Sequence, residues 1–120
     1  MRKSTLFNQK SNYWPEINQF VIAIQTEDFP DTKERVKEVA SALVAKLRLT
    51  KVNEFVHPFI PYGVTLIYVL SESHLAIHTW PERKVLHIDL VTCSDLNRRE
   101  VESVIKEIFN PQNSFFEWLN

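Results

Sequence analysis

The chain has 120 residues, of which 44% are hydrophobic and 24% are charged. This length suits one domain and is too short for two ordinary domains. Its 14 basic and 15 acidic residues leave a net charge of −1 without a basic stripe, and no run of about 18 apolar residues occurs, so neither a nucleic acid nor a membrane is an expected partner.

The N-terminal residues 1–16 are polar and aperiodic, which predicts a loosely held arm ahead of a single domain over residues 17–120. The arm carries Arg2, Lys3 and Lys10 but lacks the apolar segment of a signal peptide. We therefore expect a cytoplasmic protein.

The domain begins with a β-like run and a helical pattern. β-branched and aromatic residues predict a strand over residues 17–25. A helix is predicted from about residue 32 to residue 48, because Asp31 and Glu34 resemble a capping pair and apolar residues then recur at helical spacing.

Four more strands and a second helix follow. Pro58 and Pro61 predict an ordered loop after the first of these strands. Asp95, as the expected cap, precedes apolar residues at helical spacing, and the helix should stop before Pro111.

The third predicted strand of the domain, at residues 64–70, is apolar throughout, which predicts burial on both of its faces. The four strands are expected at residues 51–56, 64–70, 75–79 and 85–92.

This order of elements predicts an α+β fold. The simplest architecture is a two-layer sandwich in which a mainly antiparallel sheet carries two helices on one face. A domain of this size often completes its burial by dimerising. The aromatic residues Phe115, Phe116 and Trp118 are expected to cover the remaining surface or to contact a partner.

Glycine and cysteine usage excludes several kinds of site. Gly63 is the only glycine, so the chain can form neither a phosphate-binding loop nor a dinucleotide-binding fingerprint. Cys93 is the only cysteine, which excludes an intrachain disulfide and a cysteine-rich zinc site. Taken alone, such a cysteine is more often a buried apolar residue than a reactive thiol.

Four reactive side chains nevertheless fall within a short span, at Glu72, Ser73, His78 and Cys93. Ser73 could act as a nucleophile with His74 or His78 as its base. No third residue stands at an interpretable spacing to orient that base, so a hydrolase triad is not expected. A metal site is not expected either, because the chain has no ligand-spaced motif such as His-Glu-x-x-His.

Three motifs resemble the short prokaryotic S-adenosylmethionine decarboxylases. The run from Ser71 to Glu82 is similar to the processing-site signature of that family. Upstream, His57 to Thr65 resembles its His-x-Phe-x-Pro-x-Gly-Val-Ser loop, and downstream Ile88 to Cys93 resembles its Asp-x-Phe-Thr-Cys strand. The resemblance is specific, because the three motifs agree in order and separation over roughly residues 56–94.

The resemblance implies that the chain cleaves itself between Glu72 and Ser73. The Ser73 hydroxyl attacks the Glu72 carbonyl, and elimination and hydrolysis then leave a pyruvoyl group at residue 73. This group is the implied cofactor, without a metal and without pyridoxal phosphate. A substrate amine forms a Schiff base with its ketone, and the conjugated carbonyl accepts the electrons released as carbon dioxide departs. Glu72 is also assigned to the substrate site.

The same resemblance implies roles for five further residues. His78 assists the self-cleavage, the Thr65 hydroxyl steadies its intermediate, and the Cys93 thiol delivers a proton to the decarboxylated carbon. The Phe59 ring stacks on adenine and attracts the sulfonium of the substrate. The Glu82 carboxylate binds the ribose hydroxyls.

Some positions depart from the family pattern. Thr65 stands where serine is usual, Leu66 and Ser94 replace common glycines, and Ile17 to Gln19 replaces an early Gly-x-His. Because these changes lie near the expected substrate, the self-processing residues resemble the family more closely than the substrate-binding ones do.

Three functions are therefore compatible with the sequence. The first is an S-adenosylmethionine decarboxylase that makes the aminopropyl donor for spermidine synthesis, and we favour it. The second is a pyruvoyl-dependent ornithine or arginine decarboxylase. The third is an uncleaved, non-catalytic regulatory homologue, which would have no chemical need for Ser73, His78 and Cys93 together. A homodimer of cleaved protomers, or a higher oligomer, is expected, because the active sites of the resembling family lie between two protomers.

Overall fold

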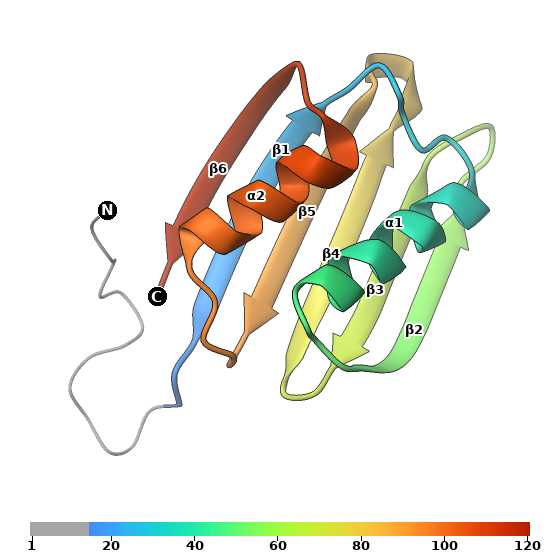
Figure 1. The fold of residues 1–120 in the computed structure, drawn as a ribbon. Coiled ribbons are helices and arrows are strands. Elements are labelled where there is room, and N and C mark those ends of the chain that lie inside the picture. The colour runs from blue at the N-terminus through green and yellow to red at the C-terminus, as the bar shows by residue number, and fades with distance from the viewer. Residues whose placement is uncertain (1–14) are drawn as a thin grey trace.

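In the computed structural model, which describes residues 15–120, a six-stranded sheet is covered by two helices (Figure 1). Residues 1–14 of the predicted N-terminal arm lie outside the described residues. The sheet has the spatial order β2-β3-β4-β5-β1-β6, and every neighbouring pair is antiparallel. The elements are β1 (Asn18–Gln25), α1 (Lys33–Lys46), β2 (Lys51–Pro58), β3 (Val64–Leu70), β4 (Ser73–Trp80), the 3₁₀ turn η1 (Pro81–Arg83), β5 (Val85–Thr92), α2 (Arg98–Phe109) and β6 (Asn113–Leu119).

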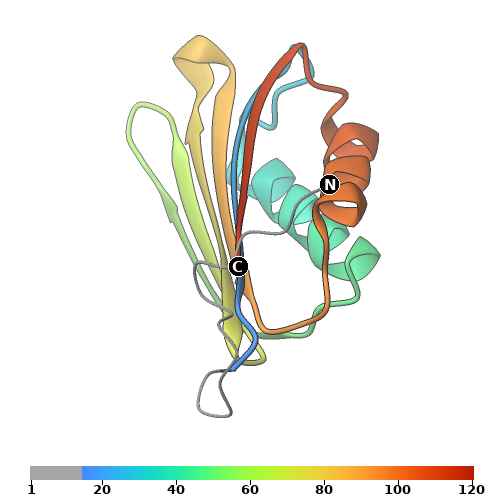
Figure 2. The ribbon, with the colours of Figure 1, turned by 90° about the vertical axis from the view of Figure 1, so that its left-hand side faces the viewer.

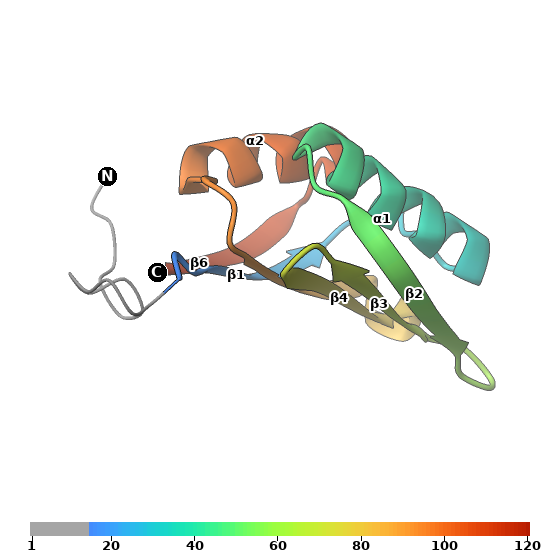
Figure 3. The ribbon, with the colours of Figure 1, turned by 90° about the horizontal axis from the view of Figure 1, so that it is seen from below.

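Both α-helices lie on one side of the sheet, and the other face is left open (Figures 2 and 3). The predicted α+β two-layer sandwich is therefore confirmed. Between residues 15 and 120, neither helix is both long enough and apolar enough to cross a bilayer.

The strands bury alternate side chains, as expected for a sheet covered on one face only. In β3 the buried residues include Leu66 and Tyr68, whereas Ile67 is 39% exposed and Val69 is 47% exposed. The predicted burial of this strand on both faces is therefore wrong for the single chain. The exposed apolar residues Ile67 and Val69 lie on the open face.

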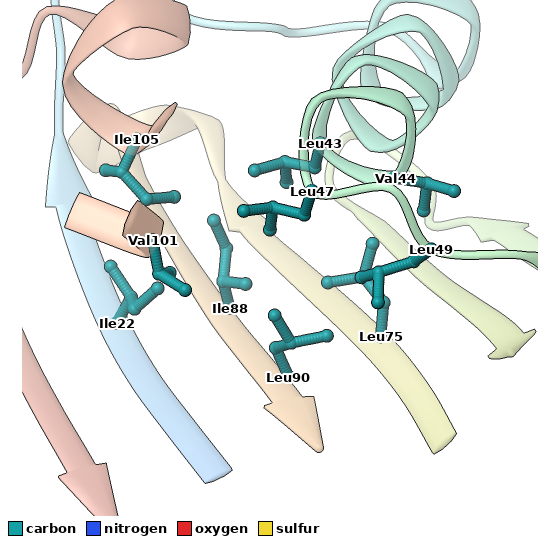
Figure 4. A pocket seen from close by; sticks show the side chains of 10 residues that line it. All are labelled: Ile22, Leu43, Val44, Leu47, Leu49, Leu75, Ile88, Leu90, Val101 and Ile105. Atoms are coloured by element: carbon teal, nitrogen blue, oxygen red, sulfur yellow. The ribbon is translucent and has the colours of Figure 1, made fainter. Parts of the chain in front are cut away.

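The core fills the space between the open sheet and the two helices. A small pocket remains between α1 and α2, over the central strands (Figure 4). All of its lining residues are aliphatic, so it is a packing feature of the core and offers no polar group to a ligand. They are Ile22, Leu43, Val44, Leu47, Leu49, Leu75, Ile88, Leu90, Val101 and Ile105.

The two helices begin at caps that differ from those predicted. Thr32 caps α1 by accepting a hydrogen bond from the Arg35 backbone N–H, and Asn97 caps α2 by accepting one from Glu100. The predicted caps Asp31 and Asp95 are therefore wrong. Before α2, the buried Leu96 anchors the chain in the core and sets Asn97 at the cap position.

The aromatic C-terminal segment forms a sixth strand, which the sequence analysis missed. β6 pairs with β1 and places Phe116 and Trp118 against the buried ring of Phe20. The Trp118 and Phe20 rings are parallel, with centroids 6.0 Å apart. The Trp118 indole N–H also donates to the Asn18 side-chain oxygen over 3.1 Å. Phe116 and Trp118 thus cover part of the core, which is one of the two roles expected for the aromatic residues, whereas Phe115 is 57% exposed on the open face.

We predict that Trp118→Ala lowers the free energy of unfolding by about 2 kcal/mol, because it removes a half-buried ring and its hydrogen bond. Urea denaturation followed by circular dichroism measures this change. The control Ser114→Ala alters an exposed side chain of the same strand and should change stability by less than about 0.5 kcal/mol. Equal stability of the two variants would contradict the role assigned to Trp118.

Candidate active site

The predicted cleavage site lies in the tight turn between β3 and β4. Leu70 pairs with Ser73 across the hairpin, so Ser71 and Glu72 alone form the turn. Glu72 has φ = 59°, in the left-handed region that residues with a β-carbon seldom adopt. Such a conformation costs on the order of 1 kcal/mol and persists only where the surrounding pairing imposes it. The peptide bond before Ser73 is therefore held in a strained turn.

Cys93 reaches this turn from the end of β5. Its thiol donates a hydrogen bond to the Glu72 carbonyl oxygen over 3.3 Å. Its backbone N–H donates to Ser73 Oγ over 3.2 Å, and that hydroxyl donates to the Ser71 carbonyl over 3.3 Å. Glu72, Ser73 and Cys93, which we call the hairpin group, thus lie together, whereas His78, the fourth reactive residue of the predicted span, does not reach them.

These contacts suit an attack of Ser73 on the preceding carbonyl. A hydrogen-bond donor at the Glu72 carbonyl oxygen stabilises the negative charge that develops there when a nucleophile adds. The Cys93 thiol occupies that donor position. The Ser71 carbonyl and the Cys93 N–H fix the hydroxyl from two sides. The hairpin group therefore combines a nucleophile, an electrophile and an oxyanion donor.

Thr65 and His78 form a second cluster on the open face. They are cross-strand neighbours on β3 and β4, and Thr65 Oγ1 lies 2.9 Å from His78 Nδ1. His57 stands opposite Thr65 on β2, and His87 stands opposite His78 on β5. The His78 and His87 rings have centroids 6.4 Å apart. The Thr65–His78 pair is thus flanked by an imidazole on each side.

The structure separates these two clusters within one chain. Thr65 and His78 lie five residues along their strands from the Leu70 and Ser73 pair, which corresponds to about 16 Å. No histidine side chain spans that distance. His78 and Thr65 therefore cannot act on Ser73 of the same chain in this fold.

Phe59 lies near the Thr65 end of the sheet, in the loop between β2 and β3. Its backbone N–H donates to the Gly63 carbonyl over 2.7 Å; the residue is 51% exposed, and its ring and the His57 ring form an edge-to-face pair with centroids 4.6 Å apart. Gly63 has φ = 104°, and a β-carbon there would lie 3.4 Å from the Thr79 carbonyl oxygen. The glycine thus lets the loop close against β4 and present the ring.

Glu82 also lies at this end, in the turn η1 that follows β4. It is exposed and borders a polar groove with the neighbouring Lys84 and Glu27. The hydrogen bond and charge of Lys84, 2.6 Å away, lower the pKa of Glu27. This ion pair occupies Lys84, and Arg83 also borders the groove. Phe59, Thr65, His78 and Glu82 are called the far group below.

The described residues 15–120 contain no group of three or more His, Cys, Asp or Glu side chains placed to hold a metal ion. The site is accordingly described by its hydroxyl, thiol, imidazole and carboxylate groups alone.

Residues 14–118 match the family model described as S-adenosylmethionine decarboxylase. The chain belongs to this family. The resemblance drawn from three short motifs is thereby extended over almost the whole chain.

Individual members of the family support this assignment. The S-adenosylmethionine decarboxylase proenzyme of Archaeoglobus fulgidus is 38% identical over 90 residues, which are 72% of this chain and 79% of that protein. The proenzyme of Thermosipho africanus is 37% identical over 83 residues, 68% of this chain and 64% of that protein. The crystal structure of the adenosylmethionine decarboxylase from Aquifex aeolicus superposes with a TM-score of 0.73 at 25% identity, covering 86% of this chain and 88% of that one.

Two residues of the site region were not predicted. Gln19 on β1 donates to the Asp89 carboxylate on β5 over 2.9 Å. Alternation in each strand could have placed both side chains on one face, but their contact depends on the register between β1 and β5. That register is not encoded by either segment alone.

We predict that Gly63→Ala lowers the free energy of unfolding by more than about 1 kcal/mol, because it forces an L-residue into a left-handed conformation. Urea denaturation at fixed protein concentration measures the loss. Ile60→Ala is the control, since that side chain is 98% exposed in the same loop and should shift stability by less than about 0.5 kcal/mol. A Gly63→Ala protein as stable as the parent would show that the loop does not need this conformation.

Proposed function

We propose that this chain is a proenzyme that cleaves itself between Glu72 and Ser73 and then decarboxylates S-adenosylmethionine. The observation that carries the proposal is the double contact of Cys93 with the Glu72 carbonyl oxygen and with Ser73 Oγ. The relatives named above are S-adenosylmethionine decarboxylase proenzymes, which supports this substrate over ornithine or arginine.

The cleavage proceeds through an ester. Ser73 Oγ bonds to the Glu72 carbonyl carbon, the peptide C–N bond breaks, and the hydroxyl proton passes to the nitrogen of residue 73. Loss of the α-hydrogen of residue 73 then breaks its Cβ–Oγ bond, so that Oγ leaves as part of a new Glu72 carboxylate. Water replaces the nitrogen, which departs as ammonia, and residue 73 becomes a pyruvoyl group.

The residues around position 73 fit such a group. A pyruvoyl group supplies a carbonyl that accepts electrons as carbon dioxide leaves a bound amino acid. The Cys93 thiol lies beside residue 73 and is placed to return a proton to the substrate carbon. Phe59 and Glu82 have exposed surfaces suited to stacking on a purine ring and to accepting hydrogen bonds from ribose hydroxyls.

We predict that the purified protein separates under denaturing conditions into two fragments, residues 1–72 and 73–120. Intact-mass measurement should find the second fragment lighter by one ammonia than a fragment starting with serine. Ser73→Ala should remain a single chain, whereas the control Ser103→Ala, an exposed residue of α2, should be cleaved normally.

Activity is then measured as carbon dioxide released from S-adenosylmethionine, with ornithine and arginine as comparison substrates. A parent protein that stays intact near 14.1 kDa after long incubation would contradict the proposed cleavage and favour a regulatory homologue. A cleaved protein that prefers ornithine or arginine would contradict only the proposed substrate.

A complete site needs two copies of this chain. The hairpin group and the far group lie at opposite ends of one sheet, so a site containing both must combine the hairpin group of one protomer with the far group of another. A two-fold axis crossing the strands brings these ends together twice, once at each site. We therefore assign the chain to a homodimer.

The open face of the sheet supplies a suitable surface for this dimer. No helix covers it (Figure 3), and several large apolar side chains are exposed on it. Exposed apolar side chains on a sheet face are typical of an interface between proteins. The exposed apolar residues on this face include Phe55, Ile67, Val69 and Phe115.

We predict that a Ser73→Ala chain restores the cleavage of a His78→Ala chain. A His78→Ala chain should be cleaved slowly alone, because its own partner also lacks the imidazole, and at least tenfold faster when co-expressed with Ser73→Ala. The mixed dimer places an intact Ser73 beside an intact His78. Chains carrying tags of different mass are followed by mass spectrometry.

The control pairs Ser73→Ala with Cys93→Ala, two changes within the hairpin group. Mixing should leave the cleavage rate of the Cys93→Ala chain unchanged, because no mixed site contains both intact residues. Unchanged cleavage of the His78→Ala chain on mixing would contradict a site shared between protomers.

A further inference from the structure

A polar contact beside the cleavage site joins three strands on the open face. Asp89 on β5 accepts a hydrogen bond from the Gln19 side-chain amide through Oδ1 over 2.9 Å. Its other oxygen, Oδ2, lies 3.4 Å from His74 Nε2. Neither the cleavage step nor the proposed substrate contacts use this network.

The register explains why one carboxylate serves both neighbours. Val91 of β5 stands between His74 of β4 and Gln19 of β1. Asp89 lies two residues further along β5 and is therefore diagonal to both, within reach of long side chains. Its direct neighbours, Ala76 and Val21, are small or apolar and do not compete for its oxygens. The Asp89 side chain is 29% exposed and is fixed from two sides.

His74 is covalently bonded to the residue that becomes the pyruvoyl group. Besides its strand pairing with Leu70, residue 73 has three restraints before cleavage, which are its peptide bond to Glu72 and two hydrogen bonds at Oγ, from Cys93 and to Ser71. The proposed cleavage removes all three restraints, because the peptide bond breaks and Oγ leaves with Glu72. The reaction thus turns the start of β4 into a free chain end, and free ends of strands tend to fray.

We propose that His74, Asp89 and Gln19 anchor this new chain end and hold the pyruvoyl group in position. This inference rests on the proposed self-cleavage. The His74 imidazole is the first side chain after the group, and Asp89 ties it to β5 while Gln19 ties Asp89 to β1. The three are positioning residues, because they act on the group through the backbone of β4 and not by direct contact.

A purely structural contact between His74 and Asp89 would behave differently. Exposed polar contacts contribute little to stability, and whatever they contribute is independent of whether the turn is cut. An anchor of the new chain end matters only after cleavage, since the intact turn already holds residue 73. Comparison of cleaved and uncleaved protein therefore separates the two roles.

In the test, the substitution Asp89→Ala is introduced into two proteins, the parent chain, which is cleaved, and the Ser73→Ala chain, which stays uncleaved. Amide hydrogen exchange at residues 74–76, measured by nuclear magnetic resonance, should accelerate about tenfold in the cleaved Asp89→Ala protein, the effect of losing one ordinary hydrogen bond. In the Ser73→Ala background the same substitution should leave exchange at these residues unchanged. In the cleaved protein kcat should fall with KM nearly constant.

Controls and outcomes distinguish this inference from the proposed function. Glu107→Gln removes a carboxylate paired with Lys46 on the helical side and should alter neither exchange at residues 74–76 nor kcat. Should Asp89→Ala fold poorly, His74→Ala removes the same contact from the other partner. Equal exchange in both backgrounds, or no change in either, overturns the anchor while the cleaved parent still supports the proenzyme. A parent that is never cleaved overturns both.

Discussion

The register of β4 against its two neighbours is the constraint on which the site depends. Pairing with β3 leaves only Ser71 and Glu72 to form the turn and places Thr65 beside His78. Pairing with β5 brings Cys93 to the same turn. Because side chains alternate along each strand, a slip of one residue would turn the His78 side chain to the helix side and move Cys93 away from Glu72. The hydrophobic core fixes this register, since Leu75 and Ile77 are buried under the helices.

This sheet also imposes a division of labour on the protein. A hairpin places a hydroxyl, a carbonyl and a thiol at one end, while imidazole, hydroxyl, aromatic ring and carboxylate lie at the other. A short chain cannot fold one end of a six-stranded sheet onto the other. The proposed association of two copies would solve this geometric problem and would cover the exposed apolar side chains of the open face in the same step.

Sequence reasoning located most elements and the residues of the hairpin group, but it failed for features that depend on contacts between segments distant in the chain. Ser73, Glu72 and Cys93 carry recognisable motifs, and the structure places them in contact, whereas the roles expected for them stay predictions. The caps at Thr32 and Asn97 were missed because several polar residues precede each helix, and core packing decides among them. β6 was missed because its aromatic residues are buried only by packing against Phe20 of β1, a contact that the segment itself does not reveal. The separation of His78 from Ser73 likewise follows from strand length, which motif spacing does not express.

If the chain is cleaved at the turn as proposed, the strand order has a consequence for the cleaved protein. Residues 1–72 contribute β1, β2 and β3, and residues 73–120 contribute β4, β5 and β6. In the order β2-β3-β4-β5-β1-β6, the strand β1 is inserted between two strands of the other fragment. The two pieces are therefore interlocked by hydrogen bonds and cannot drift apart without tearing the sheet. Once unfolded, however, they must find each other again in solution, so self-cleavage converts a unimolecular folding reaction into a concentration-dependent assembly.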